Sequence, residues 1–114
     1  MDPQNPQARP GVTREDFEGT SEEALRLIPS HMRAAARRYI EHGQGDDDGF
    51  VLAIAQNDLR GAFRRADPTN AARMHDWVRF FHAYVPSMAW GSCKAVQEWT
   101  AMGGLYGLRE RRHR

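Results

Sequence analysis

The sequence predicts an all-α protein, a compact bundle of about four helices in which one helix is kinked or split. Apolar residues recur every three or four positions in several stretches, which is the spacing that one face of an α-helix requires. Capping residues and glycines delimit these stretches, and no stretch alternates polar and apolar residues as a half-buried strand does. The chain has 114 residues, of which 40% are hydrophobic and 27% charged, as in an ordinary single globular domain.

Composition divides the chain into three parts. Residues 1–20 contain three prolines and little to bury, which predicts a flexible N-terminal arm. Residues 21–103 carry the helical pattern and form the predicted helical domain. Residues 104–114 are rich in arginine, and because an isolated helix with so much charge is marginal, they are expected to form a mobile basic tail.

The first substantial helix is expected over residues 30–42. Gly43 follows it, at the position where a positive φ commonly ends a helix. A polar loop comes next, and Asp48 is expected to cap a second helix that begins at Phe50.

The second helix carries the expected break. Asn57 and Asp58 interrupt its apolar pattern near the middle, which predicts a kink or a division into two pieces. Its predicted buried side consists of Val51, Ile54, Leu59, Ala62 and Phe63.

The most apolar helix is expected over residues 68–85. Asp67 can accept hydrogen bonds from the free amides at its start, and Pro68 suits the first helical position. A final helix, capped by Ser92, is expected to reach about Met102. The predicted buried side of the apolar helix consists of Met74, Trp77, Val78, Phe81 and Val85.

No combination of residues predicts catalysis, a metal ion or a cofactor. The acidic loop around Asp46 resembles part of a calcium-binding loop, but the acidic ligands required at its first and last positions would be Gln44 and Ala55. His75 and His82 are separated by two helical turns, roughly 10 Å along the axis, which is too far for one metal ion.

The cysteine content of the chain bears on disulfide formation and on catalysis. The single cysteine, Cys93, cannot form an internal disulfide, and no histidine is placed beside it as a nucleophile would need. The protein is therefore predicted not to be an enzyme.

No signal peptide or membrane-spanning run is recognisable, which predicts a cytoplasmic protein that does not associate with a membrane.

Positive charge is concentrated at the C-terminal end. The formal charge of the chain is +1, but the last six residues carry +3, which leaves −2 on the other 108 residues. A dedicated DNA-binding domain usually has a basic folded body, so this distribution disfavours one.

Three groups of residues are candidates for binding a partner. Phe80 and Tyr84 lie toward the rim of the apolar helix face and are expected to form an exposed apolar patch. Asp46 and Asp47 belong to the acidic loop. Guanidinium groups suit contacts with carboxylate or phosphate, and those of the tail belong to Arg109, Arg111, Arg112 and Arg114.

Four stretches of the chain carry a family resemblance: Ile28-Pro29-Ser30-His31-Met32-Arg33, Arg37-Arg38-Tyr39-Ile40-Glu41-His42-Gly43, Asn57-Asp58-Leu59-Arg60-Gly61-Ala62-Phe63 with Arg65-Ala66-Asp67, and Trp90-Gly91-Ser92 with Val96 and Trp99. They resemble a family of small helical proteins of unassigned activity that phages and prophages encode. The resemblance covers about residues 27–101, and its motifs are structural, so it assigns no functional residue. The acidic loop at residues 45–49 replaces a turn with proline and glycine that is common in the family.

The resemblance implies a phage accessory protein. The expected function is a non-enzymatic module that binds a protein assembly of host or phage, with inhibition of a bacterial defence system (anti-CRISPR-like) as its specific form. The alternative is a small regulator that contacts nucleic acid through arginine–phosphate pairs. Besides the tail, the arginines considered for those contacts are Arg33, Arg37, Arg60, Arg64 and Arg65.

Overall fold

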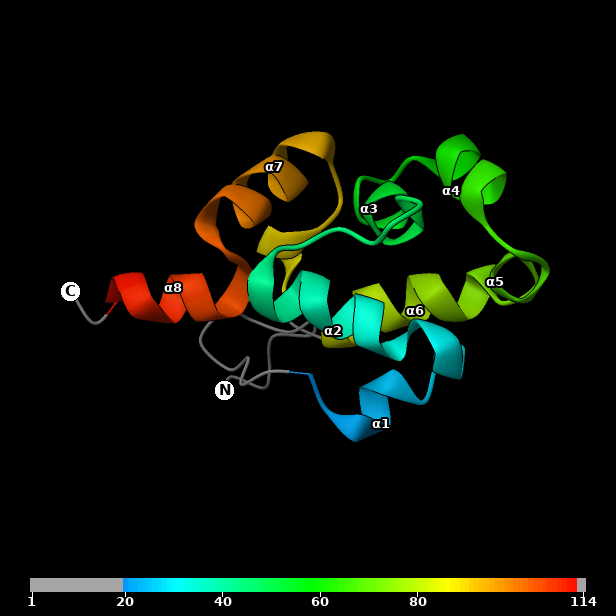
Figure 1. The fold of residues 1–114 in the computed structure, drawn as a ribbon, viewed down its shortest axis with the longest axis horizontal. Helices are drawn as coiled ribbons and strands as arrows, with labels where there is room; N and C mark the ends of the chain where they lie inside the picture. Colours follow the sequence, from blue (N-terminus) through cyan, green and yellow to red (C-terminus); the bar gives the residue numbers. More distant parts are fainter. Residues whose placement is uncertain (1–19, 113–114) are drawn as a thin grey trace, which may run out of the picture.

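The computed structural model describes residues 20–112, which fold into α-helices and short 3₁₀ helices, with no β-strand in that range (Figure 1). The prediction of an all-α fold is confirmed. Except for Thr20, the arm predicted over residues 1–20 lies outside the described residues. In chain order the helices are α1 (Glu22–Leu25), η3 (Ser30–Met32), α2 (Arg33–His42), α3 (Phe50–Ala55), α4 (Leu59–Arg65), α5 (Pro68–Ala72), α6 (Met74–Tyr84), η4 (Ser87–Ala89), α7 (Cys93–Met102) and α8 (Gly104–Arg112).

The helix predicted over residues 30–42 is present as the 3₁₀ turn η3 followed by α2. Gly43 ends it with a φ of 69°, and its backbone N–H donates to the carbonyl of Tyr39 at 2.9 Å. A residue with a side chain would be strained in this left-handed conformation, so glycine is the residue that suits the end of α2.

The helix predicted to begin at Phe50 is divided into α3 and α4, as the interruption at Asn57 and Asp58 predicted. Asn57 has a φ of 65°, which turns the chain out of α3. Asp58 then caps α4, because its carboxylate accepts the N–H of Gly61 at 2.9 Å.

The long apolar helix predicted after Asp67 consists of two helices, α5 and α6, that meet at Arg73. Asp67 caps α5 as expected, since its carboxylate accepts the N–H of Asn70 at 2.7 Å. Arg73 leaves the helical conformation, and its guanidinium donates to the carbonyl of Leu27 at 2.5 Å and to Asp76 at 2.6 Å. The contact with Leu27 joins segments far apart in sequence, so the local pattern does not predict it.

Aromatic side chains form the centre of the core, between α2, α3, α6 and α7. Trp77 is fully buried and packs edge-on against Phe50, with ring centroids 5.2 Å apart. The side-chain oxygen of the buried Asn70 accepts the indole N–H of Trp77 at 3.1 Å, so this N–H is not left without a partner. The largest buried aromatic side chains are Trp77, Trp99, Tyr39, Phe50, Phe80 and Phe81.

The C-terminal segment, which the sequence predicts to be a mobile basic tail, is helical over residues 104–112. Residues 104–112 form α8, which extends beyond the C-terminal end of α2 and packs against it (Figure 1). Gly43 and Gly104 meet at this junction, where a Cβ on Gly104 would lie 2.5 Å from the backbone nitrogen of Gly43. Leu105, the next residue, is buried. Gly104 therefore permits a close contact between α8 and α2. This packing stabilises the helix although the segment alone has a low tendency to form one.

The bond between Asn70 and Trp77 gives a first test of this core. Asn70→Ala leaves the buried indole N–H unpaired, so the free energy of unfolding should fall by about 1–3 kcal/mol. Thr69→Ala, at the exposed neighbouring position, should change it by no more than about 0.5 kcal/mol. Urea unfolding followed by tryptophan fluorescence measures both variants, and equal losses would contradict a special role for the bond.

The contact between Gly43 and Gly104 gives a second test. Gly104→Ala adds a clash with backbone atoms to the strain of a φ of 68°. Gly91→Ala is the matched control, because Gly91 has a φ of 110° and an added Cβ would meet nothing within 4 Å. Thermal unfolding should show Gly104→Ala to be less stable than Gly91→Ala by about 1–3 kcal/mol, the usual cost of overpacking. Equal losses would mean that α8 is not held by this contact.

Candidate functional site

Three large apolar side chains that the helical pattern predicts to be buried lie at the surface. Leu59 is 65% exposed, Phe63 48% and Val78 49%. The prediction of a buried side is therefore wrong at these positions. The turn between α3 and α4 gives α4 its own direction, and the residues that α4 buries are the small Gly61 and Ala62, so its larger apolar side chains stay in solvent.

Two of these side chains, Leu59 and Val78, line a groove between α4 and α6. Leu59 and Phe63 lie one turn apart on α4, and Met74 and Val78 lie one turn apart on α6. The groove has a cavity volume of about 50 Å³, well below the roughly 300–1,000 Å³ of small-molecule sites, so it suits the tip of a side chain rather than a substrate. We refer to it as the α4–α6 groove; Phe63 does not line it. Its lining residues are Ile54, Asn57, Asp58, Leu59, Ala62, Met74 and Val78.

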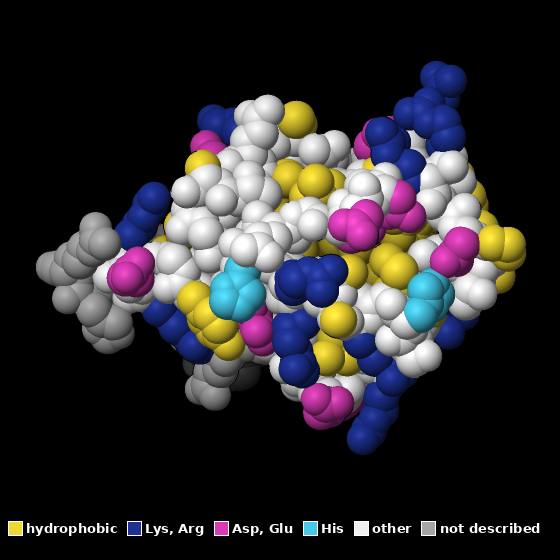
Figure 2. Space-filling model, in the orientation of Figure 1, with side chains coloured by type: hydrophobic (Ala, Val, Ile, Leu, Met, Phe, Trp, Pro, Cys, Tyr) yellow, Lys and Arg dark blue, Asp and Glu magenta, His cyan; other side chains and the backbone are white. Residues whose placement is uncertain are grey.

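Basic side chains accompany both apolar rows. Because successive residues of a helix are about 100° apart, Arg60 and Arg64 project from the side of α4 opposite Ala62 and do not line the groove, whereas His75 and Arg79 stand next to the apolar row of α6. All four side chains are exposed, and none forms an ion pair with another residue in the range 20–112. Figure 2 shows Lys and Arg side chains projecting from the corner of the molecule that α4 occupies.

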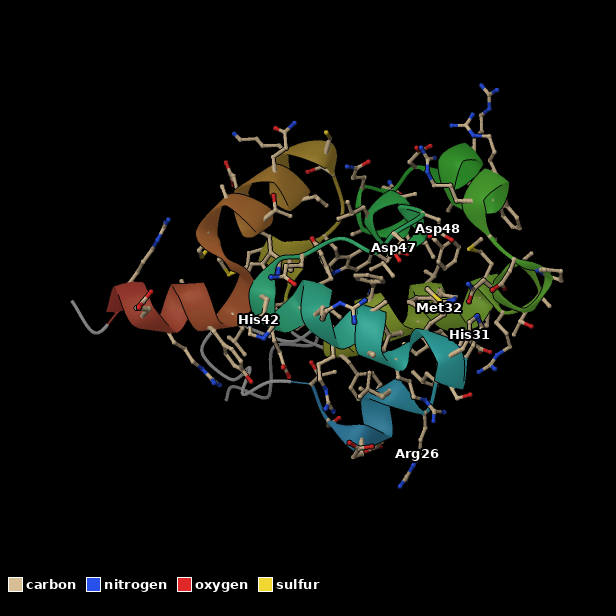
Figure 3. All side chains as sticks on the ribbon, in the orientation of Figure 1. Arg26, His31, Met32, His42, Asp47 and Asp48 are labelled. Atoms are coloured by element: carbon tan, nitrogen blue, oxygen red, sulfur yellow. The ribbon has the colours of Figure 1, made fainter. Side chains whose placement is uncertain are left out.

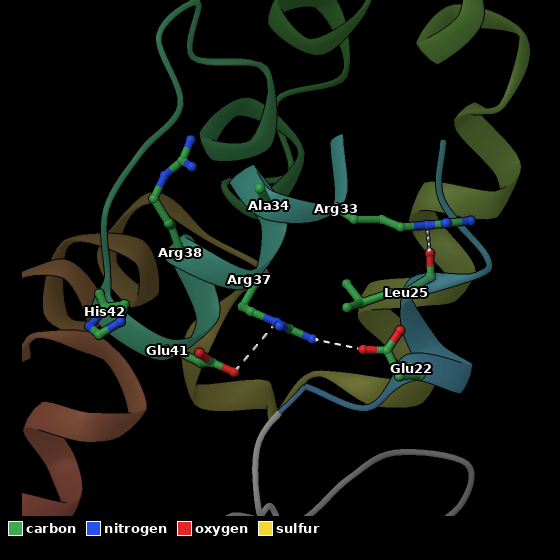
Figure 4. Close-up of a pocket in the computed structure, with 8 residues that line it drawn as sticks. All are labelled: Glu22, Leu25, Arg33, Ala34, Arg37, Arg38, Glu41 and His42. Atoms are coloured by element: carbon green, nitrogen blue, oxygen red, sulfur yellow. Dashed lines mark hydrogen bonds and ion pairs between the residues drawn. The ribbon is translucent and has the colours of Figure 1, made fainter. Parts of the chain in front are cut away.

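A larger pocket, with a volume of about 380 Å³, lies between α1 and α2 (Figure 4). Arg37 stands in it between two carboxylates, with N–O distances of 3.2 Å to Glu22 and 3.9 Å to Glu41. Arg33 donates to the carbonyl of Leu25 at 2.8 Å. Both arginines are thus bound within the chain and hold α1 against α2, which makes them less available to an anionic ligand. The pocket is lined by Glu22, Leu25, Arg33, Ala34, Arg37, Arg38, Glu41 and His42.

The arginines considered for phosphate contacts do not share one surface. Arg33 and Arg37 belong to the pocket between α1 and α2, whereas Arg60 and Arg64 lie on α4. Arg65 donates to a carbonyl of its own helix at 3.3 Å. The arginines of α8 are at the other end of the molecule from α4 (Figure 1). Phosphate contacts along a nucleic acid need basic groups on a common face, so the folded arrangement gives the nucleic-acid alternative little support.

The apolar patch predicted at Phe80 and Tyr84 is not formed. Phe80 is fully buried, because its ring packs edge-on against Trp77 and Phe81 with centroids 6.1 Å and 5.5 Å away. The prediction of an exposed Phe80 is therefore wrong. Tyr84 is half-buried, and its hydroxyl lies 3.5 Å from the carboxylate of Glu23. The exposed edge of α6 is the one that carries Val78.

Two side chains of the acidic loop bond to the first turn of α3. The carboxylate of Asp46 accepts the N–H of Val51 at 3.0 Å, and that of Asp48 accepts the N–H of Phe50 at 3.1 Å. The N-cap residue of α3 is Gly49, so the prediction that Asp48 occupies this position is wrong by one residue. Asp47 is exposed, and Figure 3 places it with Asp48 above α2, away from the basic α8. Burial raises the pKa of Asp46, and its hydrogen bond with Asp48 adds to this rise.

The arginines expected in the tail are on α8 or beyond it. The guanidinium of Arg109 lies over the ring of Tyr106, 5.8 Å from its centroid, and this ring packs edge-on against His42. Arg111 is exposed, and Arg112 ends α8. Arg114 lies outside the described residues. The three predicted groups of binding residues are therefore not brought together by the fold.

Comparison of the chain with protein-family models, with curated protein sequences and with solved structures gives no match. Among residues 20–112, no helix combines the length and the apolar character that crossing a membrane requires. The same residues contain no cluster of three or more His, Cys, Asp or Glu side chains arranged to hold a metal ion.

The pH dependence of stability tests the environment of Asp46. A carboxyl group whose pKa is raised in the folded state stabilises it fully when protonated, and loses this contribution as the pH rises through the folded pKa. Asp46→Asn keeps an oxygen for the N–H of Val51 and carries no charge. Its stability relative to the wild type should therefore rise between about pH 3 and pH 7.

Asp46→Ala is the companion variant, because it removes both the charge and the acceptor. It should be less stable than Asp46→Asn by about 1 kcal/mol, the usual effect of losing a capping bond. Urea titrations at several pH values measure both differences. If the difference between Asp46→Asn and the wild type did not change with pH, the raised pKa would be contradicted.

Proposed function

We propose that the chain is a protein-interaction module that docks a partner protein through the α4–α6 groove. The observation that carries this proposal is the exposure of Leu59 and Val78, which line one groove, together with that of Phe63, one turn from Leu59 on α4. Large apolar side chains grouped at a surface are typical of sites that become buried on binding. Arginines beside an apolar centre match the composition of protein interfaces, in which aromatic residues and arginine are enriched.

The shape of the surface also favours a protein partner over a small molecule. The α4–α6 groove is too small to enclose a substrate, but it has room for one inserted side chain. In the larger pocket between α1 and α2, Arg37 pairs with Glu22 and Glu41, and the pair with Glu22 joins the two helices.

We place this module among the accessory proteins of phages, on the resemblance of residues 27–101 to small proteins that phages and prophages encode. The specific form of the proposal is inhibition of a bacterial defence system, in which the groove binds one component of the defence assembly. The resemblance and the docking surface support this form of the proposal. Identification of the bound partner tests whether the chain inhibits a defence system.

Site-specific photo-crosslinking in bacteria tests the docking surface. A benzophenone-bearing amino acid replaces Phe63 in one variant and Tyr106 in the other. The two positions are matched, because they are aromatic residues of helices and are 48% and 44% exposed. The variant with the probe at position 63 should form a discrete covalent adduct with one protein, which mass spectrometry identifies, and the variant with the probe at position 106 should not.

The absence of an adduct at position 63, in the presence and absence of phage infection, would contradict the proposed function. Equal adducts at the two positions would also contradict it, because the capture would then be nonspecific. An adduct with a defence component would support the inhibitory form, and an adduct with an unrelated protein would exclude that form while retaining the module.

A further inference from the structure

The lining of the α4–α6 groove is apolar except at one turn of the chain. Ile54 and Ala62 are buried and therefore lie deepest in it, whereas Leu59 and Val78 are exposed and border it. The two polar lining residues, at positions 57 and 58, are neighbours in the turn between α3 and α4, so they lie together. A side chain that fills the groove therefore meets hydrocarbon over most of its surface and polar groups at one place.

Among residues 20–112, Asp58 is the only charged residue that lines the groove. Its carboxylate oxygen Oδ1 accepts the N–H of Gly61 at 2.9 Å, which caps α4. No basic group in the described range lies within ion-pair distance of this carboxylate. Arg65, which lies near it, donates instead to the carbonyl of Gly61 at 3.3 Å. Because Asp58 is exposed, its charge is open to a group that enters the groove.

The basic residues of α4 and α6 near the groove do not line it. Arg60 and Arg64 project from the outer side of α4, and His75 and Arg79 lie beside the apolar row of α6. All four side chains are exposed, where water and salt weaken their field. The charge in contact with a group inside the groove is therefore the negative charge of Asp58.

A long basic side chain matches this combination of an apolar lining and one carboxylate. Lysine and arginine bury their methylene stems along apolar surface while the charged head stays in water. Of the two, arginine is enriched in protein interfaces and lysine is depleted. The planar guanidinium has five N–H donors, enough to bond both the oxygen Oδ2 of Asp58 and the side-chain oxygen of Asn57. An acidic or purely apolar side chain would leave the carboxylate without a partner.

We propose that the α4–α6 groove receives an arginine side chain of the partner protein, a proposal that rests on the proposed function. The stem of this arginine packs against Ile54, Ala62 and Val78, and its guanidinium pairs with Asp58. Hydrogen bonds between a guanidinium and a carboxylate are directional, so the pair orients the partner on the surface. The apolar side chains around the groove add burial to this contact.

NMR titration of the isotope-labelled full chain with designed peptides tests the proposal. The probe is a helical peptide of about 18 residues, long enough to hold a helix, with an arginine between two leucines on one face and a citrulline on the opposite face. In the comparison peptide the arginine and the citrulline exchange places, so composition and net charge are the same. A third peptide has glutamate at the central position. Amide shifts measure the dissociation constant and locate the bound peptide.

Two protein variants each remove one negative charge. Asp58→Asn removes the charge in the groove, and asparagine caps a helix about as well as aspartate does, so α4 keeps its N-cap. Asp47→Asn is the matched control, because Asp47 is also exposed but does not line the groove.

The wild-type chain should bind the probe about twofold to fivefold more tightly than the comparison peptide, the range of one exposed ion pair. The glutamate peptide should bind most weakly, and the shifts should be largest at Leu59, Ala62 and Val78. Asp58→Asn should bind the probe and the comparison peptide equally, with the wild-type affinity for the comparison peptide. A misfolded variant cannot retain that affinity. Asp47→Asn should keep the full preference for the probe.

Equal binding of the probe and the comparison peptide by the wild type, or tighter binding of the glutamate peptide, would overturn the proposal. A preference that persists in Asp58→Asn, shifts confined to another surface, or failure of all three peptides to bind would also overturn it. Shifts at the groove that grow with the concentration of the chain alone would assign the groove to a second copy and overturn the proposal as well. The docking function itself fails separately, only if the adduct at position 63 is absent or nonspecific.

Discussion

The rest of the structure depends on the buried C-terminal turn of α2, and above all on Tyr39. Its hydroxyl donates to the carbonyl of Ala89 in η4, and its own carbonyl accepts the indole N–H of Trp99 in α7 at 3.0 Å. One turn later, Gly43 meets Gly104 and allows α8 to pack against α2. Burial raises the pKa of the Tyr39 hydroxyl, so it stays a protonated donor at neutral pH. A single turn therefore joins three elements from the C-terminal part of the chain, and each broken bond would leave a buried polar group unsatisfied.

The α4–α6 groove is a consequence of how the helices are divided. Asn57 ends α3 and turns the chain, and Arg73 separates α5 from α6 by reaching the carbonyl of Leu27. Short helices joined by such turns do not bury all of their apolar side chains against one core. The short α4 buries small residues, so Leu59 and Phe63 remain exposed although their spacing is that of a buried face.

The arginine of the pocket between α1 and α2 differs from the exposed arginines of α4 in its ion pairing within the chain. In the pocket between α1 and α2, Arg37 is held between Glu22 and Glu41, so its charge serves the contact between two helices. On α4, Arg60 and Arg64 are exposed on a helix with no acidic residue of its own. Ion pairing within the chain therefore involves Arg37 and neither Arg60 nor Arg64. An apolar groove of such small volume is suited to a partner's side chain rather than to a substrate.

Local sequence and tertiary packing account for different features of this protein. The all-α class, the break at Asn57 and the cap at Asp67 follow from bonds between residues a few positions apart, so the sequence predicts them. Helical periodicity also identifies the residues that share a face, but which part of that face is covered depends on elements distant in sequence. For this reason Phe80 is buried and Val78 is exposed, the reverse of what the pattern predicts. The local sequence pattern does not predict the packing of α8 against α2 either. That packing depends on the close approach of Gly43 and Gly104, which only the folded chain brings together.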